Sequence, residues 1–329
     1  MNALLVRQRS TALLIAALLV GTLLSYGRPF WLDNSIMVGI FGLMALSVGL
    51  SYGQAGILSM ATAGFASVGA FGSALLSTRY GLSPLVGLPL AVLGPVLLAY
   101  PLARAITRLS PLPLSIATFL LSGIFEIAVR EGGDFTGGYV GMSGIPPLPF
   151  VQGPQQMHFV VWAVVLVVVV LYSNLMASTY GRAIKTARHD PLRATADGVD
   201  VPHLLASTFA ASAAIAGLAG WLYAHHMSYM GPDSLTTHVS ISVMLMAVVG
   251  GAGTLLGPLL GAGLLTLLTL YLPAAETQGM VFGVILLVVL VFAPDGLVGT
   301  SWWHRSKKKT AANGSAVSSM VSKGDAHEH

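Results

Sequence analysis

The sequence predicts an all-α, polytopic integral membrane protein with about ten transmembrane helices. Hydrophobic residues make up 55% of the 329 residues and charged residues only 9%, against about 25% charged residues in an ordinary soluble domain. The stretch 160–171 is apolar at every position, whereas the strands of a membrane β-barrel alternate apolar and polar residues. Helices are therefore the elements expected to satisfy the backbone in lipid.

Long apolar stretches predict where the chain crosses the membrane. A spanning helix needs about 20 mostly apolar residues, and the predicted spans cover residues 11–27, 36–52, 56–77, 84–106, 112–130, 157–176, 203–228, 237–252, 255–272 and 276–292. No small-x-small cleavage site follows the first span, which favours an uncleaved helix over a secretory signal. Residues 1–10 are expected to form a cytoplasmic N-terminus, residues 11–300 the transmembrane domain, and residues 301–329 a basic, low-complexity cytoplasmic tail.

Lysine and arginine residues predict the orientation of these spans. With the N-terminus in the cytoplasm, thirteen of the sixteen basic residues lie on the cytoplasmic side, and Arg28, Arg79 and Arg130 lie outside. Because Lys and Arg of membrane proteins collect on the cytoplasmic side, both termini are predicted to face the cytoplasm.

Residues 178–202, between the sixth and seventh predicted spans, are unusually charged and place four basic residues on the cytoplasmic side. Asp190 can cap a helix that begins at Pro191, and Gly198 can end it. Proline is tolerated at the first helical position, and glycine adopts the left-handed conformation of a helix stop. The segment therefore predicts one short helix outside the bilayer, in a position to contact another protein.

Two segments, residues 51–65 and 249–263, are rich in small residues. Close helix packing is one explanation, because small residues let helix backbones approach each other. The other is a solute path lined by Gln54, Ser59 and Thr62, because polar side chains in a membrane face the bundle interior or a water-filled cavity. The sequence leaves both interpretations open.

The chain shows no residues arranged for catalysis, metal binding or nucleotide binding. It has no cysteine, and it contains no GxxxxGK[ST], HExxH or GxSxG motif. Glu126 lies one helical turn before Arg130, where an i,i+4 ion pair can satisfy its charge. His225 and His226 are adjacent and face different sides of their helix, which argues against a shared metal site. The glycine-rich residues 130–150 lack a GxGxxG fingerprint, and they predict a loop folded against the outer mouth of the bundle.

The charged segment resembles the cytoplasmic coupling loop of the branched-chain amino acid ABC permeases, specifically their M-type subunit. The resemblance starts from Gly181-Arg182-Ala183, Arg188, Asp190, Ala196 and Gly198-Val199-Asp200, and it continues in residues 53–56, 136–138 with 144–146, 250–254 with 257–258, and 292–299. It implies that the ATPase-coupling residues are Gly181, Arg182, Arg188, Asp190, Pro191, Ala196 and Gly198. Residues 59–63 are less bulky than is usual in the family, and Asp295 stands where arginine is usual.

The resemblance also implies an assembly and a function. It predicts a permease subunit of an importer in the bacterial inner membrane, with a fold similar to the vitamin B12-type importers. The expected partners are a second permease subunit, of a different H type, two cytoplasmic ATP-binding subunits and a periplasmic solute-binding protein. No cofactor and no nucleic acid is expected. Branched-chain or related hydrophobic amino acids are the expected solutes.

Other functions stay open at this point. Permeases related to this family serve urea and other small polar solutes. An ion-coupled secondary carrier could use backbone carbonyls at broken helices, although it would not need the charged helix. An intramembrane enzyme is a third class, but the sequence offers no paired catalytic groups.

Overall fold

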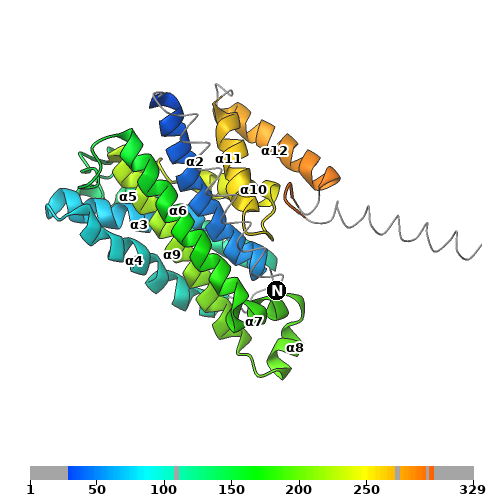
Figure 1. The fold of residues 1–329 in the computed structure, drawn as a ribbon. Helices are drawn as coiled ribbons and strands as arrows, with labels where there is room; N and C mark the ends of the chain where they lie inside the picture. The colour runs from blue at the N-terminus through cyan, green and yellow to red at the C-terminus, as the bar shows by residue number, and fades with distance from the viewer. Residues whose placement is uncertain (1–28, 107–110, 271–274, 294–295, 300–329) are drawn as a thin grey trace, which may run out of the picture.

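The structure, a computed structural model of the chain, describes residues 29–106, 111–270, 275–293 and 296–299. Helices dominate this part of the chain (Figure 1). They are α2 (Pro29–Val48), the π-helix η1 (Gly49–Gln54), α3 (Thr62–Arg79), α4 (Pro84–Ile106), α5 (Pro111–Glu131), the 3-10 turn η2 (Gly133–Phe135), α6 (Pro154–Ala177), α7 (Thr179–His189), α8 (Pro191–Ala196), α9 (Val201–Met227), α10 (Thr237–Gly250), α11 (Gly257–Thr269) and α12 (Ala275–Phe292). Two short strands, β1 (Met142–Ser143) and β2 (Tyr229–Met230), pair antiparallel.

Each predicted span from 36–52 to 276–292 overlaps a described helix, and the prediction of an all-α, polytopic membrane protein is confirmed. Five described helices are long and apolar enough to cross a membrane: α2 with η1, α4, α5, α6 and α9. Helices α10 and α11 have 14 and 13 residues, fewer than the roughly 20 residues of a full span. The predicted span 11–27 and the two terminal segments lie outside the described residues.

Two predicted helix starts are wrong. Helix α2 begins at Pro29, seven residues before the predicted start. The span predicted at 56–77 begins only at Thr62, because Gly56 has a left-handed φ of +74°. The amide of Ile57 then turns back to donate to the carbonyl oxygen of Ser51 at 2.9 Å. Residues 55–61 therefore form an irregular connection between η1 and α3.

Helices α3, α4 and α9 pack together on one side of the bundle, and α2 lies between them and the helices α10 and α11 (Figure 1). Glycines allow the closest of these contacts. A Cβ atom added at Gly220 of α9 would lie 1.9 Å from the carbonyl oxygen of Ala66 on α3, and one added at Gly69 would lie 2.3 Å from the carbonyl oxygen of Gly217. The backbones of α3 and α9 are thus in direct contact.

The loop between α5 and α6 folds against the end of the bundle opposite α7 and α8 (Figure 1). Ile145 and Leu148 are buried there, and β1 pairs with β2 just after α9. The imidazole of His225 joins three elements, since its Nδ1 donates to the carbonyl oxygen of Pro146 at 2.8 Å and its Nε2 accepts from the Ser73 hydroxyl at 2.8 Å. These contacts fix the loop against α3 and α9.

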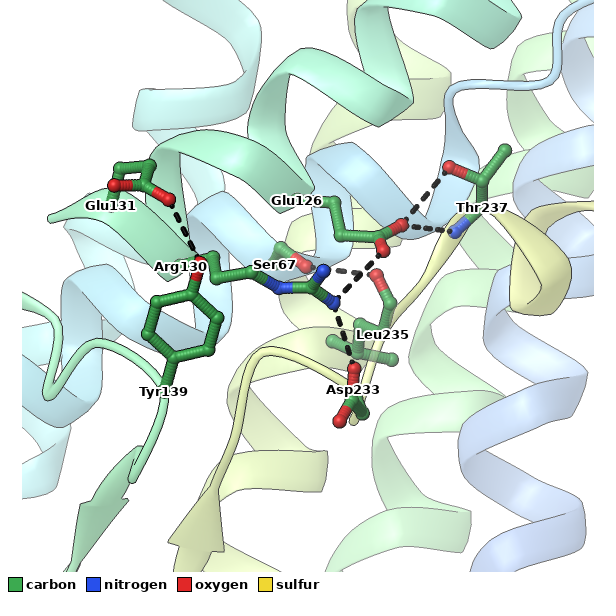
Figure 2. A network of polar contacts seen from close by, with 8 residues as sticks. All are labelled: Ser67, Glu126, Arg130, Glu131, Tyr139, Asp233, Leu235 and Thr237. Atoms are coloured by element: carbon green, nitrogen blue, oxygen red, sulfur yellow. Dashed lines mark hydrogen bonds and ion pairs between the residues drawn. The ribbon is translucent and has the colours of Figure 1, made fainter.

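A charged network closes the same end of the bundle (Figure 2). The predicted pair between Glu126 and Arg130 is present, with 3.5 Å between the carboxylate and the guanidinium. Arg130 also lies 3.0 Å from Asp233. The second carboxylate oxygen of Glu126 accepts from the amide and hydroxyl of Thr237, at 3.2 and 3.3 Å. Glu126 therefore caps α10 in addition to pairing with Arg130. The sequence analysis did not anticipate this cap.

Candidate functional site

The charged segment folds as two helices, not the single helix predicted. Helix α7 precedes α8, and its start is capped by Ser178, whose Oγ accepts from the amide of Gly181 at 3.3 Å. Gly181, Ile184 and Ala187 form the buried face of α7, while Arg182 is exposed. The apolar residues recur every three positions, which is the spacing of one helix face. That pattern was the signal for α7 that the sequence analysis missed.

Helix α8 agrees with the prediction at both ends. The Asp190 carboxylate accepts from the amide of Arg193 at 3.0 Å, and Pro191 is the first helical residue. Gly198 follows the helix with a left-handed φ of +83°. The amide of Val199 then donates to the carbonyl oxygen of Ala194 at 3.0 Å, which satisfies a carbonyl group at the helix end.

Helix α8 presents one large apolar side chain to its surroundings. Leu192 is 85% exposed, whereas Ala194 two residues later is completely buried. Ala196 is also exposed. A leucine of this exposure on a short capped helix is the kind of residue that anchors a protein contact, because burying it in a partner removes apolar surface from water. The sequence analysis did not single out Leu192.

The buried sides of α7 and α8 belong to the same hydrophobic cluster as the irregular connection between η1 and α3. Ile184 and Ala187 of α7 belong to one hydrophobic cluster with Ala55, Ile57 and Ala61. The buried alanine of α8 belongs to the same cluster. The charged segment and the small-residue segment at 51–65, which the sequence analysis treated separately, therefore share one core.

A polar contact reinforces this packing. The guanidinium of Arg188 on α7 donates to the carbonyl oxygen of Gly53 in η1. The aliphatic part of the same side chain lies against Gly56, where an added Cβ atom would be 3.3 Å from the Cγ of Arg188. Arg188 thus binds inside this chain, whereas Arg182 on the exposed face of α7 is open to a partner.

The three predicted path residues lie on the stretch from η1 to the start of α3, and all are buried. The Nε2 of Gln54 donates to the carbonyl oxygen of Gly253, between α10 and α11, at 3.0 Å. The Oγ of Ser59 accepts from the amide of Ala61 at 3.3 Å. Thr62 is the first residue of α3. Their burial agrees with polar side chains that face a bundle interior, and their role in a path stays a prediction.

Hydroxyl groups from two other helices hold the start of α3. The amide of Met60 donates to Thr118 of α5 at 3.1 Å, and the amide of Ala63 donates to Ser240 of α10 at 2.9 Å. Free amides at a helix start need such partners. Sequence reasoning missed both residues, because single Ser and Thr residues in apolar helices give no local sign of what they bind.

Within the described ranges no three His, Cys, Asp or Glu side chains gather where they could hold a metal ion.

Comparison with known proteins relates this geometry to a family. The model of the family described as "Branched-chain amino acid transport system / permease component" matches residues 30–293. This chain belongs to that family. It is therefore a transport permease, a class of subunit not known for enzymatic activity.

The curated relatives of this permease include both subunit types of the family. LivM of Salmonella typhimurium, named a high-affinity branched-chain amino acid transport system permease protein, is 28% identical over 87% of this chain and 73% of its own length. LivM of Escherichia coli is 27% identical over 92% of this chain and 78% of its own length. A probable LivH of Methanocaldococcus jannaschii is 26% identical over 84% of this chain and 94% of its own length.

The two LivM relatives confirm the resemblance to the M-type permease. No solved structure matches the chain, so the expected likeness to the vitamin B12-type importer fold stays a prediction.

Proposed function

We propose that this permease is the M-type subunit of an ATP-driven importer and forms, with a second permease subunit of the H type, the path for branched-chain amino acids. Membership of the permease family supports the transport role. The relatives named LivM and BraD are branched-chain amino acid permeases, which supports the solute class. Two ATP-binding subunits on the cytoplasmic side and a periplasmic solute-binding protein complete the proposed importer.

The observation that carries this proposal is the shared core of α7, α8 and residues 55–61. An ATPase that held the exposed Leu192 of α8 would pull on a helix that contacts α7 and α9, and α7 is bonded through Arg188 to Gly53, the residue before Gln54. Ser59 lies in the connection that follows Gln54, and Thr62 begins the helix after it. A movement of the ATPase would then be transmitted through α7 to the segment proposed to line the path.

The proposed orientation places α7 and α8 in the cytoplasm, with both termini on the same side. Four basic residues in and around these two helices support it, since Lys and Arg remain on the cytoplasmic side. The charged network of Figure 2 would then lie at the outer end of the bundle, where a solute-binding protein could dock.

Copurification and transport assays test the coupling role. In the complete complex, we expect Leu192→Asp to lower solute-stimulated ATP hydrolysis and uptake while membrane insertion is unchanged, because a charge replaces the apolar anchor. Asp197→Asn, at an exposed position five residues later, is the matched control and should behave as wild type. Wild-type uptake and wild-type copurification of the ATPase with Leu192→Asp would contradict the proposal.

A second variant tests the shape of α8 rather than its contact. Gly198→Val forces a β-branched residue into a left-handed conformation, so transport should fall while the protein still inserts.

The energy source of the wild-type protein tests the alternative function. Uptake by wild type that continued without ATP but required an ion gradient would instead support a secondary carrier.

The solute is tested separately from the coupling. We expect leucine, isoleucine or valine to raise the melting temperature of the partner binding protein, because a ligand that binds only the folded state stabilises it. A shift with urea or another small polar solute, and none with these amino acids, would select the alternative permease function.

A further inference from the structure

The chain that follows α12 lies against the end of α10 (Figure 1), and the proposed function does not use it. In this C-terminal segment, residues 296–299, the amide of Leu297 donates to the carbonyl oxygen of Val249 at 3.0 Å, and the amide of Val298 donates to that of Gly250 at 3.2 Å. Val249 and Gly250 are the last two residues of α10. The last carbonyl groups of a helix have no partner within it, so the C-terminal segment supplies partners that α10 lacks.

Two glycines bring the C-terminal segment this close to α10. Gly296 has a left-handed φ of +80°, and an added Cβ atom there would lie 2.3 Å from the Cα and 2.4 Å from the amide nitrogen of Gly251. A larger residue at this position would meet backbone atoms, in a conformation that other residues rarely adopt. Both glycines belong to stretches that resemble the permease family, 250–254 and 292–299, to which the proposed function gives no role.

The connection between α10 and α11 contacts the predicted path segment. Its Gly253 carbonyl oxygen accepts from the Gln54 amide at 3.0 Å. The two backbones also meet, since a Cβ atom added at Gly53 would lie 1.7 Å from the carbonyl oxygen of Ala252. One short stretch of backbone, residues 249–253, thus binds the C-terminal segment at its beginning and Gln54 at its end.

Few other hydrogen bonds hold this connection in place. Within the described residues, the hydrogen bonds that join residues 249–256 to distant parts of the chain come from Gln54 and from the C-terminal segment. The Thr254 hydroxyl makes local bonds, donating to the carbonyl oxygen of Gly251 at 2.9 Å and accepting from the amide of Gly257 at 3.0 Å. Local bonds shape the turn but do not fix it relative to the other helices. Apart from the Gln54 bond itself, that task falls to the C-terminal segment.

We propose that residues 296–299 are a positioning element of the solute path. By binding the end of α10, they hold the Gly253 carbonyl oxygen where Gln54 donates to it, and so they set the place of Gln54 in the path. The bonds come from backbone amides, and the side chain of Leu297 is 53% exposed, so the side chains contribute little. The inference rests on the proposed function, because it acts through the path role of Gln54.

The experiment uses the full-length chain in the complete complex, reconstituted in liposomes with its partner permease, ATPases and binding protein. We expect Gly296→Ala to lower uptake per folded complex about fivefold or more, the lower end of typical coupling between two sites, because the added Cβ atom forces the segment away from Gly251. Gly283→Ala on α12 is the matched control, since an added Cβ atom there meets nothing within 4 Å. The control should transport as wild type does.

A second pair of variants keeps the test decisive if Gly296→Ala does not fold. Leu297→Pro removes the amide that donates to Val249, whereas Leu297→Ala keeps this amide and changes only an exposed side chain. The proline variant should lower uptake per folded complex, and the alanine variant should not. Equal uptake by these two variants would overturn the inference.

A double-mutant cycle separates the positioning of Gln54 from general support of the fold. If the C-terminal segment acts through Gln54, adding Leu297→Pro to Gln54→Leu should cause no further loss of uptake per folded complex. Losses that multiply would overturn the inference, as would wild-type uptake by Gln54→Leu alone. A wild-type complex without ATP-driven uptake would overturn the proposed function, and this inference with it.

Discussion

The contact between α3 and α9 predicts a severe effect for one added methyl group. In Gly220→Ala the new Cβ atom would lie 1.9 Å from the backbone carbonyl oxygen of Ala66, about 1.5 Å closer than the 3.4 Å at which ordinary contacts begin. The contacting atom belongs to the backbone of a helix, so no side-chain rotation can relieve the overlap. The helices must separate, and overpacking of this kind costs about 1–3 kcal/mol.

The assay is the melting temperature of the purified protein together with the yield of folded protein. We expect Gly220→Ala to melt at least about 3 °C below wild type, since 1 kcal/mol shifts the melting temperature of larger domains by roughly 2–4 °C. Gly123→Ala on α5 is the matched control, because an added Cβ atom there meets nothing within 4 Å.

Alanine favours a helix over glycine by about 1 kcal/mol, so the control should melt at or above the wild-type temperature. A Gly220→Ala protein as stable as this control would refute the close backbone contact of α3 and α9.

Three further predictions follow from the other end of the bundle and from the path. In this cysteine-free chain, Asp134→Cys should react with an impermeant thiol reagent added outside intact cells, and Ser178→Cys should not; labelling at Ser178 would reverse the proposed orientation. Arg130→Met removes two ion pairs that are partly exposed to solvent, so it should lower stability by only about 1 kcal/mol, and the loss should shrink at high salt; a loss independent of salt would contradict an electrostatic role. Gln54→Leu and Thr62→Val should keep the amount of folded protein and lower uptake per folded complex, whereas an unchanged ratio would show that these residues serve packing alone.

Features with a local cause were predictable from the sequence. Asp190, Pro191 and Gly198 lie within nine residues of each other, and each has a conformational preference strong enough to define the start or the end of α8. The pair of Glu126 and Arg130 was equally accessible, because both residues lie on one helix at i,i+4 spacing.

Contacts between distant segments were not predictable. The Gln54 amide binds a carbonyl group 199 residues later, and Arg188 binds one 135 residues earlier. Backbone carbonyls carry no sequence signature, so neither bond could be inferred from residue types. The irregular residues 56–61 were assigned to a helix, because small and apolar residues occur both in helices and in irregular segments. The left-handed φ of Gly56 is what ends the helical conformation there.

The enclosed position of α2 has a consequence for how the protein is made. Of the five helices long enough to span a membrane, α2 with η1 is the most enclosed, with 78% of its most apolar window buried. Its neighbours include α9, α10 and α11, which begin about 150 residues or more after α2 ends. At roughly 5–20 residues per second, synthesis takes about 8–30 s after α2 to reach even the first of these neighbours, α9.

During this interval the future centre of the bundle faces lipid or an insertion chaperone. Its mean hydropathy of 1.8 allows α2 to stay in lipid alone, but any charged substitution on α2 would be exposed to lipid before the later helices are inserted. Biosynthesis, more than the finished fold, is then expected to limit which residues α2 can accept.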